Sequence, residues 1–122
     1  MKYIMITGAS SGIGEETARL LARQEDVTTI LVARNEEKLK KLVNEFGGET
    51  KYLVYDLTDV WHIESCFIKC REWGIKLDGL IHCAGIGENM PIRLIQTEHI
   101  KKMYQIHPMA FIELGKYSVS YT

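Results

Sequence analysis

Three closely spaced glycines near the start of the chain, Gly8, Gly12 and Gly14, have the spacing best suited to chemistry. They follow the short apolar run Lys2–Thr7 and precede a segment with helical periodicity. A glycine-rich turn between a strand and a helix lets the backbone approach a phosphate group, and the helix N-terminus adds free N–H groups and a positive dipole end. The sequence therefore predicts a phosphate-binding turn, with a connector that binds nothing as the alternative.

The rest of the chain alternates short β-branched runs with longer segments of helical period. Strands are expected at Lys2–Thr7, Val27–Val32, Tyr52–Tyr55 and Leu80–His82. Helices are expected from Glu15 to about Gln24, from an Asn35 cap to Gly47-Gly48, from a Thr58 or Asp59 cap to Gly74, and from Thr97 onward. Residues 83–96, between the last strand and the last helix, are expected to form a long loop, and loops of that length are often functional.

This order of elements predicts an α/β fold with a parallel sheet, because each crossover between strands is long enough to hold a helix. We expect a single domain over residues 1–122. Its sheet is expected to be a partial Rossmann-type, doubly wound parallel sheet of about four strands in the order 3-2-1-4. Ligands of such sheets bind beyond the carboxyl ends of the strands, where the glycine-rich turn also lies.

Composition argues against several classes of protein. Fifteen Lys and Arg residues balance sixteen Asp and Glu residues, so the basic excess typical of nucleic-acid-binding domains is missing. No apolar run is long enough to span a bilayer, and the N-terminal run is too short for a signal peptide, so we expect a cytoplasmic protein. The three cysteines, Cys66, Cys70 and Cys83, show no disulfide spacing and are expected to be free thiols.

The segment Thr7–Gly14, TGASSGIG, resembles the cofactor motif of the short-chain dehydrogenases/reductases. LVARNEEKL at 31–39, YDLTD at 55–59 and HCAG at 82–85 resemble further motifs of that family, and the match extends to about Leu114. The resemblance implies an NAD(P)(H)-dependent oxidoreductase. The cofactor-binding residues that it implies are Gly8, Ser10, Ser11, Gly12, Ile13, Gly14, Asp56, Leu57, Cys83, Ala84 and Gly85.

Arg34 is the residue expected to distinguish the two nicotinamide cofactors. It directly follows Ala33, which holds the position of the acidic residue in NAD-preferring relatives. An acidic residue there accepts hydrogen bonds from the NAD ribose, whereas an arginine pairs with the 2′-phosphate of NADP. We therefore expect NADP(H) to be favoured over NAD(H). The alternative for Arg34 is a solvated charge at the end of a strand.

Two further positions carry competing interpretations. Asp56 is implied by the resemblance to contact the adenine amino group, with the Leu57 backbone beside it, but it could also cap the following turn. His82 and Cys83 replace two asparagines of the family motif, of which the second usually braces the sheet around the cofactor. Cys83 cannot make the same amide hydrogen bonds, so weaker cofactor binding is expected.

His107 stands where the family has a catalytic asparagine at an irregular point of a helix. Pro108 has no N–H to give to the carbonyl of Tyr104, so a kink is expected there. Helical spacing predicts that His107 faces inward, and the alternative to a role in proton relay is a buried, hydrogen-bonded histidine. The positions that define this spacing are Ile100, Met103, His107, Ala110 and Leu114.

His62, Cys66 and Cys70 lie at i, i+4 and i+8 of the third predicted helix, a spacing that could align three metal ligands. Ile63 and Phe67 share much of that surface, and free cysteines are often simply part of a core. We therefore expect no metal site.

The family's catalytic pair, a tyrosine with a lysine four residues later, does not occur in these 122 residues. Tyr117, for example, is followed at that spacing by Tyr121. The tyrosine gives a proton to the carbonyl substrate, and general acid catalysis contributes about 10²–10⁴-fold to the rate. The chain alone is therefore expected to be inactive in carbonyl and alcohol redox chemistry, as a dinucleotide-binding N-terminal part truncated before the catalytic residues.

Three functions stay open. The favoured one is the cofactor-binding part of an NADP(H)-dependent oxidoreductase. The others are a non-catalytic dinucleotide-binding or interaction module, and a non-binding remnant that persists through oligomer contacts. The fourth strand is expected to be an open edge, and Phe111 and Leu114 of the last helix are expected to lack cover. A homo-oligomer through either surface is therefore expected, with no nucleic-acid or membrane partner.

Overall fold

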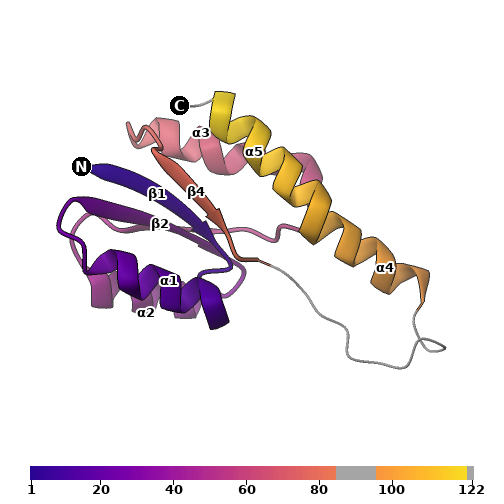
Figure 1. Cartoon of the computed structure of the whole chain (residues 1–122), viewed down its shortest axis with the longest axis horizontal. Helices are drawn as coiled ribbons and strands as arrows, with labels where there is room; N and C mark the ends of the chain where they lie inside the picture. Colours follow the sequence, from indigo (N-terminus) through magenta and orange to yellow (C-terminus); the bar gives the residue numbers. More distant parts are fainter. Residues whose placement is uncertain (85–95, 121–122) are drawn as a thin grey trace.

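The computed structural model describes residues 1–84 and 96–120 of the chain (Figure 1). Its strands are β1 (Lys2–Thr7), β2 (Val27–Ala33), β3 (Lys51–Val54) and β4 (Gly79–His82). Its helices are α1 (Gly12–Ala22), α2 (Glu36–Phe46), the 3-10 turn η1 (Val60–His62), α3 (Glu64–Glu72), α4 (Thr97–Tyr104), the π-helical turn η3 (Gln105–Met109) and α5 (Ala110–Ser120). The predicted alternation of strands and helices is confirmed.

The four strands form one parallel sheet in the order β3-β2-β1-β4, as the sequence predicts. Its register aligns Thr7 at the end of β1 with Val32 of β2 on one side and with His82 of β4 on the other. The carboxyl ends of neighbouring strands therefore meet at one edge of the sheet. Within the described residues β4 pairs with β1 alone, so β4 is an edge strand.

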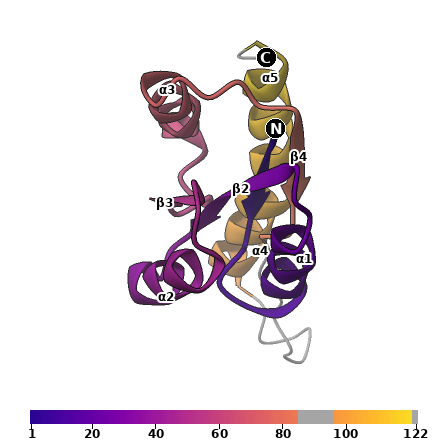
Figure 2. The ribbon, with the colours of Figure 1, turned by 90° about the vertical axis from the view of Figure 1, so that its left-hand side faces the viewer.

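Helices cover both faces of this sheet, α1 and α2 on one side and α3 and α5 on the other (Figure 2). Met5 and Val32 pack in the core beneath α3 and α5, whereas Ile6 and Leu31 pack in the core beneath α1 and α2. All four side chains are fully buried. Burial on both faces explains why these strands are continuous apolar runs rather than alternating ones.

The ends of the helices are set by side chains that the sequence identifies. Asn35 caps α2 by accepting a hydrogen bond from the Lys38 amide at 3.1 Å, and Gly47 ends it with a φ of +67°. The Asp59 carboxylate caps η1, a single 3-10 turn, rather than α3 itself. Helix α1 begins at Gly12, three residues before the predicted start, because the glycine-rich turn is already helical at its end.

The last helical region is interrupted by η3, at the place where Pro108 predicts an irregularity. The Ala110 amide donates to the carbonyl of Gln105, five residues earlier, as in a π-helix. The prediction that His107 faces inward is wrong, because His107 is exposed and Ile106 is 5% exposed. The extra residue of the π-turn shifts the helical register by one position, so that Ile106 joins Ala110 and Leu114 in the core.

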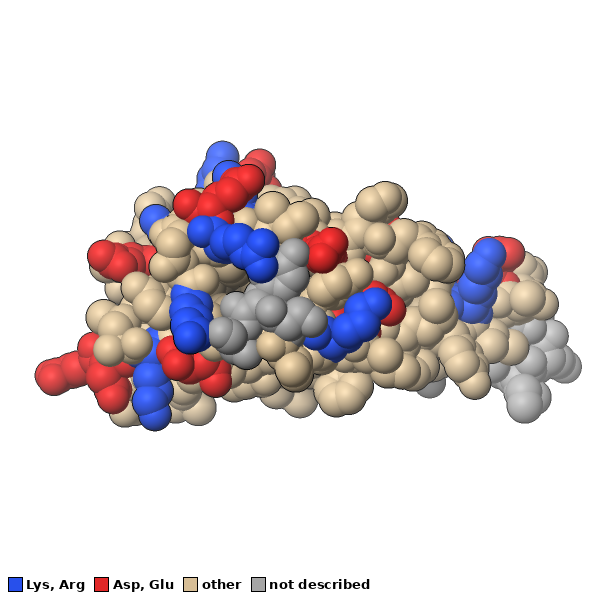
Figure 3. Space-filling view, turned by 90° about the horizontal axis from the view of Figure 1, so that it is seen from above, with Lys and Arg blue, Asp and Glu red and all other residues tan. Residues whose placement is uncertain are grey.

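The prediction that Leu114 lacks cover is also wrong, since it is fully buried against the sheet. Phe111 and Ile112 on the other side of α5 are 59% and 63% exposed. Acidic and basic side chains are interspersed over the face shown in Figure 3 and do not gather into one basic patch. Among the described residues, no helix combines the length and apolarity needed to cross a membrane.

Candidate dinucleotide site

The turn between β1 and α1 favours glycine at all three of its glycine positions, for reasons that differ between them. Gly8 has a φ of +68°, and a Cβ on it would come within 2.6 Å of the Ala84 amide nitrogen. A Cβ on Gly14 would overlap the Gly8 carbonyl group. The contact at Gly8 packs the turn against the segment that follows β4, and the contact at Gly14 packs the start of α1 against the end of β1. Gly12 has a φ of +58°, which favours glycine, but a Cβ on it would meet no described atom within 4 Å. Among the described residues, this point of the turn is therefore open to a ligand.

The N-terminus of α1 is free to bind an anion. Ser11 precedes the helix in an extended conformation, and its side chain makes no capping hydrogen bond. The first amides of a helix have no partner within the helix, and they lie at the positive end of its dipole. Ile13 in the first turn is 79% exposed, so solvent or a ligand reaches this end of the helix. The geometry suits a pyrophosphate at the start of α1.

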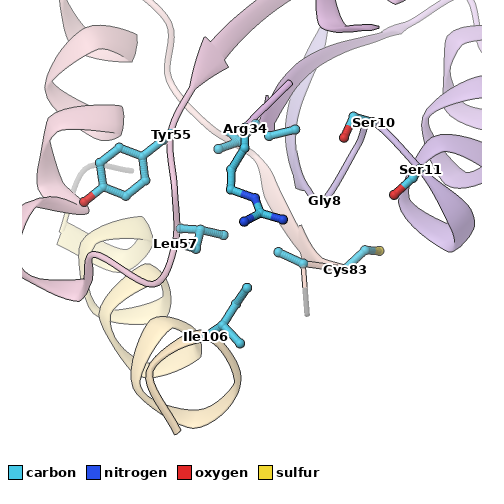
Figure 4. Close-up of a pocket in the computed structure, with 11 residues that line it drawn as sticks. Gly8, Ser10, Ser11, Arg34, Tyr55, Leu57, Cys83 and Ile106 are labelled. Atoms are coloured by element: carbon cyan, nitrogen blue, oxygen red, sulfur yellow. The ribbon is translucent and has the colours of Figure 1, made fainter. Parts of the chain in front are cut away.

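A cavity of about 120 Å³ lies at the carboxyl edge of the sheet beside this turn (Figure 4). It gathers most of the residues implied by the family resemblance. Its lining is Gly8, Ser10, Ser11, Val32, Ala33, Arg34, Tyr55, Leu57, Cys83, Ala84 and Ile106. Residues from the ends of β1, β2, β3 and β4 therefore converge on one space, as expected for a ligand site of a doubly wound sheet.

Arg34 reaches into the middle of this space. In Figure 4 its guanidinium lies between Leu57 on one side and the turn that carries Gly8 and Ser10 on the other. The Arg34 residue is exposed, and within the described part of the chain its side chain makes no ion pair. A planar guanidinium in this position can bind a phosphate through two parallel hydrogen bonds.

Asp56 is oriented by the turn that follows β3. Its Oδ1 accepts hydrogen bonds from the Thr58 amide at 3.0 Å and the Thr58 hydroxyl at 2.7 Å. Burial alone raises the pKa of Asp56, but these hydrogen bonds and the charges of Arg34 and Lys102 lower it below its ordinary value. Asp56 is therefore a carboxylate near neutral pH that caps its turn beside the cavity, although it is not part of the lining.

A buried hydrogen-bond network joins the cavity floor to the π-turn. Thr7 Oγ1 accepts from the Cys83 amide at 3.0 Å and the Ala84 amide at 3.2 Å, and lies 2.7 Å from His82 Nδ1. His82 Nε2 lies 3.3 Å from the Ile106 carbonyl oxygen. Burial lowers the pKa of His82, the Ile106 hydrogen bond opposes that shift, and nearby His107 adds to it. His82 is therefore neutral at neutral pH.

Acidification is expected to destabilise the fold through His82. The unfolded chain protonates this imidazole at about pH 6.5, whereas the folded chain does so only at lower pH. Below about pH 6.5 the unfolded state therefore binds more protons, and the free energy of unfolding falls as the pH drops toward the folded pKa. Urea unfolding between about pH 8 and about pH 5.5 measures this loss.

The matched variants are His82→Gln, which removes the titrating group, and His62→Gln, which removes an exposed histidine paired with Asp59. His82→Gln is expected to flatten the pH dependence in this window, and His62→Gln is expected to preserve most of it. An unchanged slope in His82→Gln would assign the acid sensitivity to another group.

A second hollow of about 460 Å³ adjoins the first at Cys83 and Ala84. It is lined by Ile13, His82, Cys83, Ala84, His107, Pro108 and Phe111. Cys83 and Ala84 line both spaces, so the two hollows adjoin along the carboxyl edge of the sheet. His107, although exposed, faces this second hollow from the π-turn.

The predicted site residues therefore divide into groups. Seven of them line the first cavity, namely Gly8, Ser10, Ser11, Arg34, Leu57, Cys83 and Ala84. Ile13 and His107 line the second hollow, Gly12, Gly14 and Asp56 shape the turns beside these spaces, and Gly85 lies outside the described residues. The sequence analysis did not identify Val32, Tyr55 and Ile106 as lining residues, and the position of Pro108 was the one available signal for Ile106.

Cys66 and Cys70 are core residues. Both are buried, and burial raises the pKa of Cys66 to about 12 and of Cys70 to about 11. They are therefore protonated thiols at neutral pH, unsuited to bind a metal or act as nucleophiles. His62 is exposed and lies within hydrogen-bond distance of the Asp59 carboxylate, and the described residues contain no group of three potential metal ligands.

Comparison with known proteins identifies the family to which this site belongs. The family model described as short chain dehydrogenase matches residues 2–120, nearly the whole chain. The chain belongs to the short-chain dehydrogenase family. The resemblance that rests on the glycine-rich turn and the three later motifs is thus confirmed at the level of the family.

Two curated proteins are similar in sequence to most of this chain. The chain is 36% identical over 110 residues to an uncharacterized oxidoreductase of Listeria innocua, covering 87% of this chain and 44% of that protein. It is 35% identical over 109 residues to a benzil reductase ((S)-benzoin forming) of Saccharomyces cerevisiae, covering 85% and 41%. The chain thus spans less than half the length of these curated relatives.

Solved structures of the family match the fold closely. The alcohol dehydrogenase from the archaeon Thermococcus sibiricus, complexed with 5-hydroxy-NADP, superposes with a TM-score of 0.88 at 30% identity. The match covers 99% of this chain and 53% of that one. The four-stranded sheet and its helices are thus arranged as in the corresponding half of a larger enzyme.

Proposed function

We propose that this chain is the dinucleotide-binding part of a short-chain oxidoreductase and that it prefers NADP(H) to NAD(H). The observation that carries the preference is Arg34, whose guanidinium lies in the cavity at the end of β2 with Ala33, not an acidic residue, before it. An arginine at this position can pair with a 2′-phosphate. The residue before it is the uncharged Ala33, so no acidic side chain there would repel that phosphate.

The residues present suit the parts of the dinucleotide in order. The open point at Gly12 and the uncapped amides of α1 would hold the pyrophosphate. The Leu57 backbone and Asp56 would flank the adenine, and Cys83-Ala84 would pass beneath the adenosine ribose. The nicotinamide, when bound, supplies or accepts a hydride. It would lie toward the second hollow, where His107 faces the space.

We further propose that the 122-residue chain does not reduce carbonyl compounds by itself. None of its six tyrosines has a lysine four residues later, and His107 takes the place of the family's catalytic asparagine. The chain would then bind the nucleotide, and a positioned acid for the substrate would have to come from elsewhere. The free thiols of Cys66, Cys70 and Cys83 support a reducing compartment such as the cytoplasm.

Thermal unfolding with and without nucleotide tests this proposal. A ligand that binds only the folded state stabilises it by about 2.7 kcal/mol at 100 times its Kd. NADPH is expected to raise Tm more than NADH at equal concentration, and inorganic phosphate at that concentration is the control for a non-specific anion effect. Equal shifts for NADPH and NADH would remove the proposed preference, and no shift for either would remove the binding function.

We also propose that the chain forms a homo-oligomer through β4 and the exposed side of α5. An unpaired edge strand invites pairing, and Phe111 and Ile112 expose apolar surface beside it. Sedimentation velocity over a range of concentrations is expected to show dimers that Phe111→Glu dissociates. Leu20→Glu, which changes an exposed leucine of α1, is the matched control and is expected to leave the dimer intact. A monomer at every concentration would contradict the proposal.

A further inference from the structure

His82 contacts two segments that are distant in sequence. Its Nδ1 lies 2.7 Å from Thr7 Oγ1, at the end of β1, and its Nε2 lies 3.3 Å from the carbonyl oxygen of Ile106 in the π-turn. Its ring also packs against Phe111, with ring centroids 6.0 Å apart. One imidazole therefore spans from the central strand of the sheet to the irregular point of the last helical region.

The partners of the ring fix its tautomer. A carbonyl oxygen can only accept a hydrogen bond, so the hydrogen bond to Ile106 requires a proton on His82 Nε2. In the neutral ring Nδ1 is then an acceptor, and it receives the Thr7 hydroxyl proton. The Thr7 hydroxyl group, which donates a hydrogen bond to Nδ1, also accepts hydrogen bonds from the Cys83 and Ala84 amides. Every polar atom of this network thus has a partner of the right kind.

We propose that His82, in its neutral Nε2–H tautomer, is a positioning residue that holds the π-turn against the cofactor-binding edge of the sheet. This position of the π-turn determines the shape of both hollows. Ile106 forms a wall of the cavity that contains Arg34, and the next residue, His107, forms a wall of the second hollow. Fixing the Ile106 carbonyl therefore fixes both walls relative to Cys83 and Ala84, which line both hollows.

The hydrogen-bonded bridge from Thr7 through His82 to Ile106 also bears on the weaker bracing of the sheet that is expected from Cys83. Loss of an asparagine at that position predicts a weaker brace of the sheet, and the adjacent His82 side chain supplies a separate connection between β1 and the π-turn. This connection consists of two hydrogen bonds, one between the Thr7 hydroxyl group and Nδ1 of the ring and one between Nε2 and the Ile106 carbonyl oxygen. The nucleotide-binding consequence rests on the proposed function, whereas the bridge itself exists without nucleotide.

Two amide variants separate the two ends of the ring. In His82→Gln the terminal amide nitrogen can take the place of Nε2 and donate to Ile106. In His82→Asn the side chain is shorter, so it reaches Thr7 but not Ile106. Hydrogen exchange of the Ala110 amide, which closes the π-turn, is expected to be near wild type in His82→Gln and faster in His82→Asn. The exposed pair His62→Gln and His62→Asn is the control and is expected to change neither.

Nitrogen-15 NMR of the wild-type imidazole tests the tautomer directly and does not depend on how the variants fold. A protonated Nε2 and an unprotonated Nδ1 are expected for His82. The opposite tautomer, or equal Ala110 exchange in His82→Gln and His82→Asn, would overturn the inference.

Nucleotide affinity is measured on the same variants. His82→Asn is expected to raise the Kd for NADPH about three- to tenfold, the range for loss of one hydrogen bond, and His82→Gln to restore it. Absence of NADPH binding to wild type would reject the proposed function, while the tautomer and exchange results would still decide whether the bridge exists. Equal NADPH affinity in His82→Asn and wild type would overturn the link from the bridge to the cofactor site.

Discussion

Arg34→Ala is expected to raise the Kd for NADPH about ten- to a hundredfold and to leave the Kd for NADH within about twofold, since a hydrogen-bonded charge contributes about 1.5–3 kcal/mol. The reason is the position of the guanidinium in the cavity at the end of β2, between Leu57 and the glycine-rich turn. Only NADPH places a phosphate on the adenosine ribose for Arg34 to bind. Fluorescence titration of each nucleotide against both proteins measures the two constants.

Arg23→Ala is the matched control, because Arg23 caps the far end of α1 and is also exposed. It removes the same charge from the protein but not from the site, so both constants are expected to stay near wild type. If Arg34→Ala weakened NADPH and NADH equally, Arg34 would act on the shared part of the dinucleotide. The proposed preference for NADP(H) would then be wrong.

Gly14→Ala is expected to lower the free energy of unfolding by about 3 kcal/mol or more, at the upper end of the range for overpacking. Gly14 is buried, and a Cβ there would overlap the Gly8 carbonyl group, with the Ala9 amide nitrogen only 3.2 Å away. Both are backbone groups of the turn, so neither can move aside without displacing β1 from α1. Urea unfolding followed by circular dichroism measures the change.

Gly115→Ala is the matched control for helix propensity. Gly115 lies in α5, and a Cβ on it would meet no described atom within 4 Å. Replacing a helical glycine by alanine in open space stabilises a helix by about 0.5–1 kcal/mol. Gly14→Ala is thus expected to lower the free energy of unfolding, and Gly115→Ala is expected to raise it. A Gly14→Ala protein as stable as wild type would show that the turn is not packed as the structure describes.

The sequence predicts well the features that depend on local chemistry. The Asn35 cap and the Gly47 stop follow from patterns within a few residues, and the structure confirms them. The strand order follows from the doubly wound topology that the alternating strands and helices predict, and the structure confirms it as well. The lining of the Arg34 cavity was also largely predictable, because parallel strands bring their carboxyl ends to one edge. Seven residues implied by the motifs meet there.

The errors lie where tertiary packing changes a local register. Pro108 signals an irregular helix, but a helical pattern of constant period cannot show which side chain the irregularity turns inward. The π-turn buries Ile106 and exposes His107, the reverse of the regular spacing. The role of His82 depends on Thr7 and Ile106, which are 75 and 24 residues away from it, so no local pattern could reveal it.

Titration of the 122-residue chain with NADPH and NADH by calorimetry tests the central claim most directly. The structure has an uncapped helix N-terminus for the pyrophosphate and an arginine beside it for a 2′-phosphate. We therefore expect saturable binding of both nucleotides, with NADPH the tighter by about tenfold or more, the equivalent of about 1.4 kcal/mol. Tighter binding of NADH would contradict the cofactor assignment, and heats no larger than dilution for both would contradict the dinucleotide site itself.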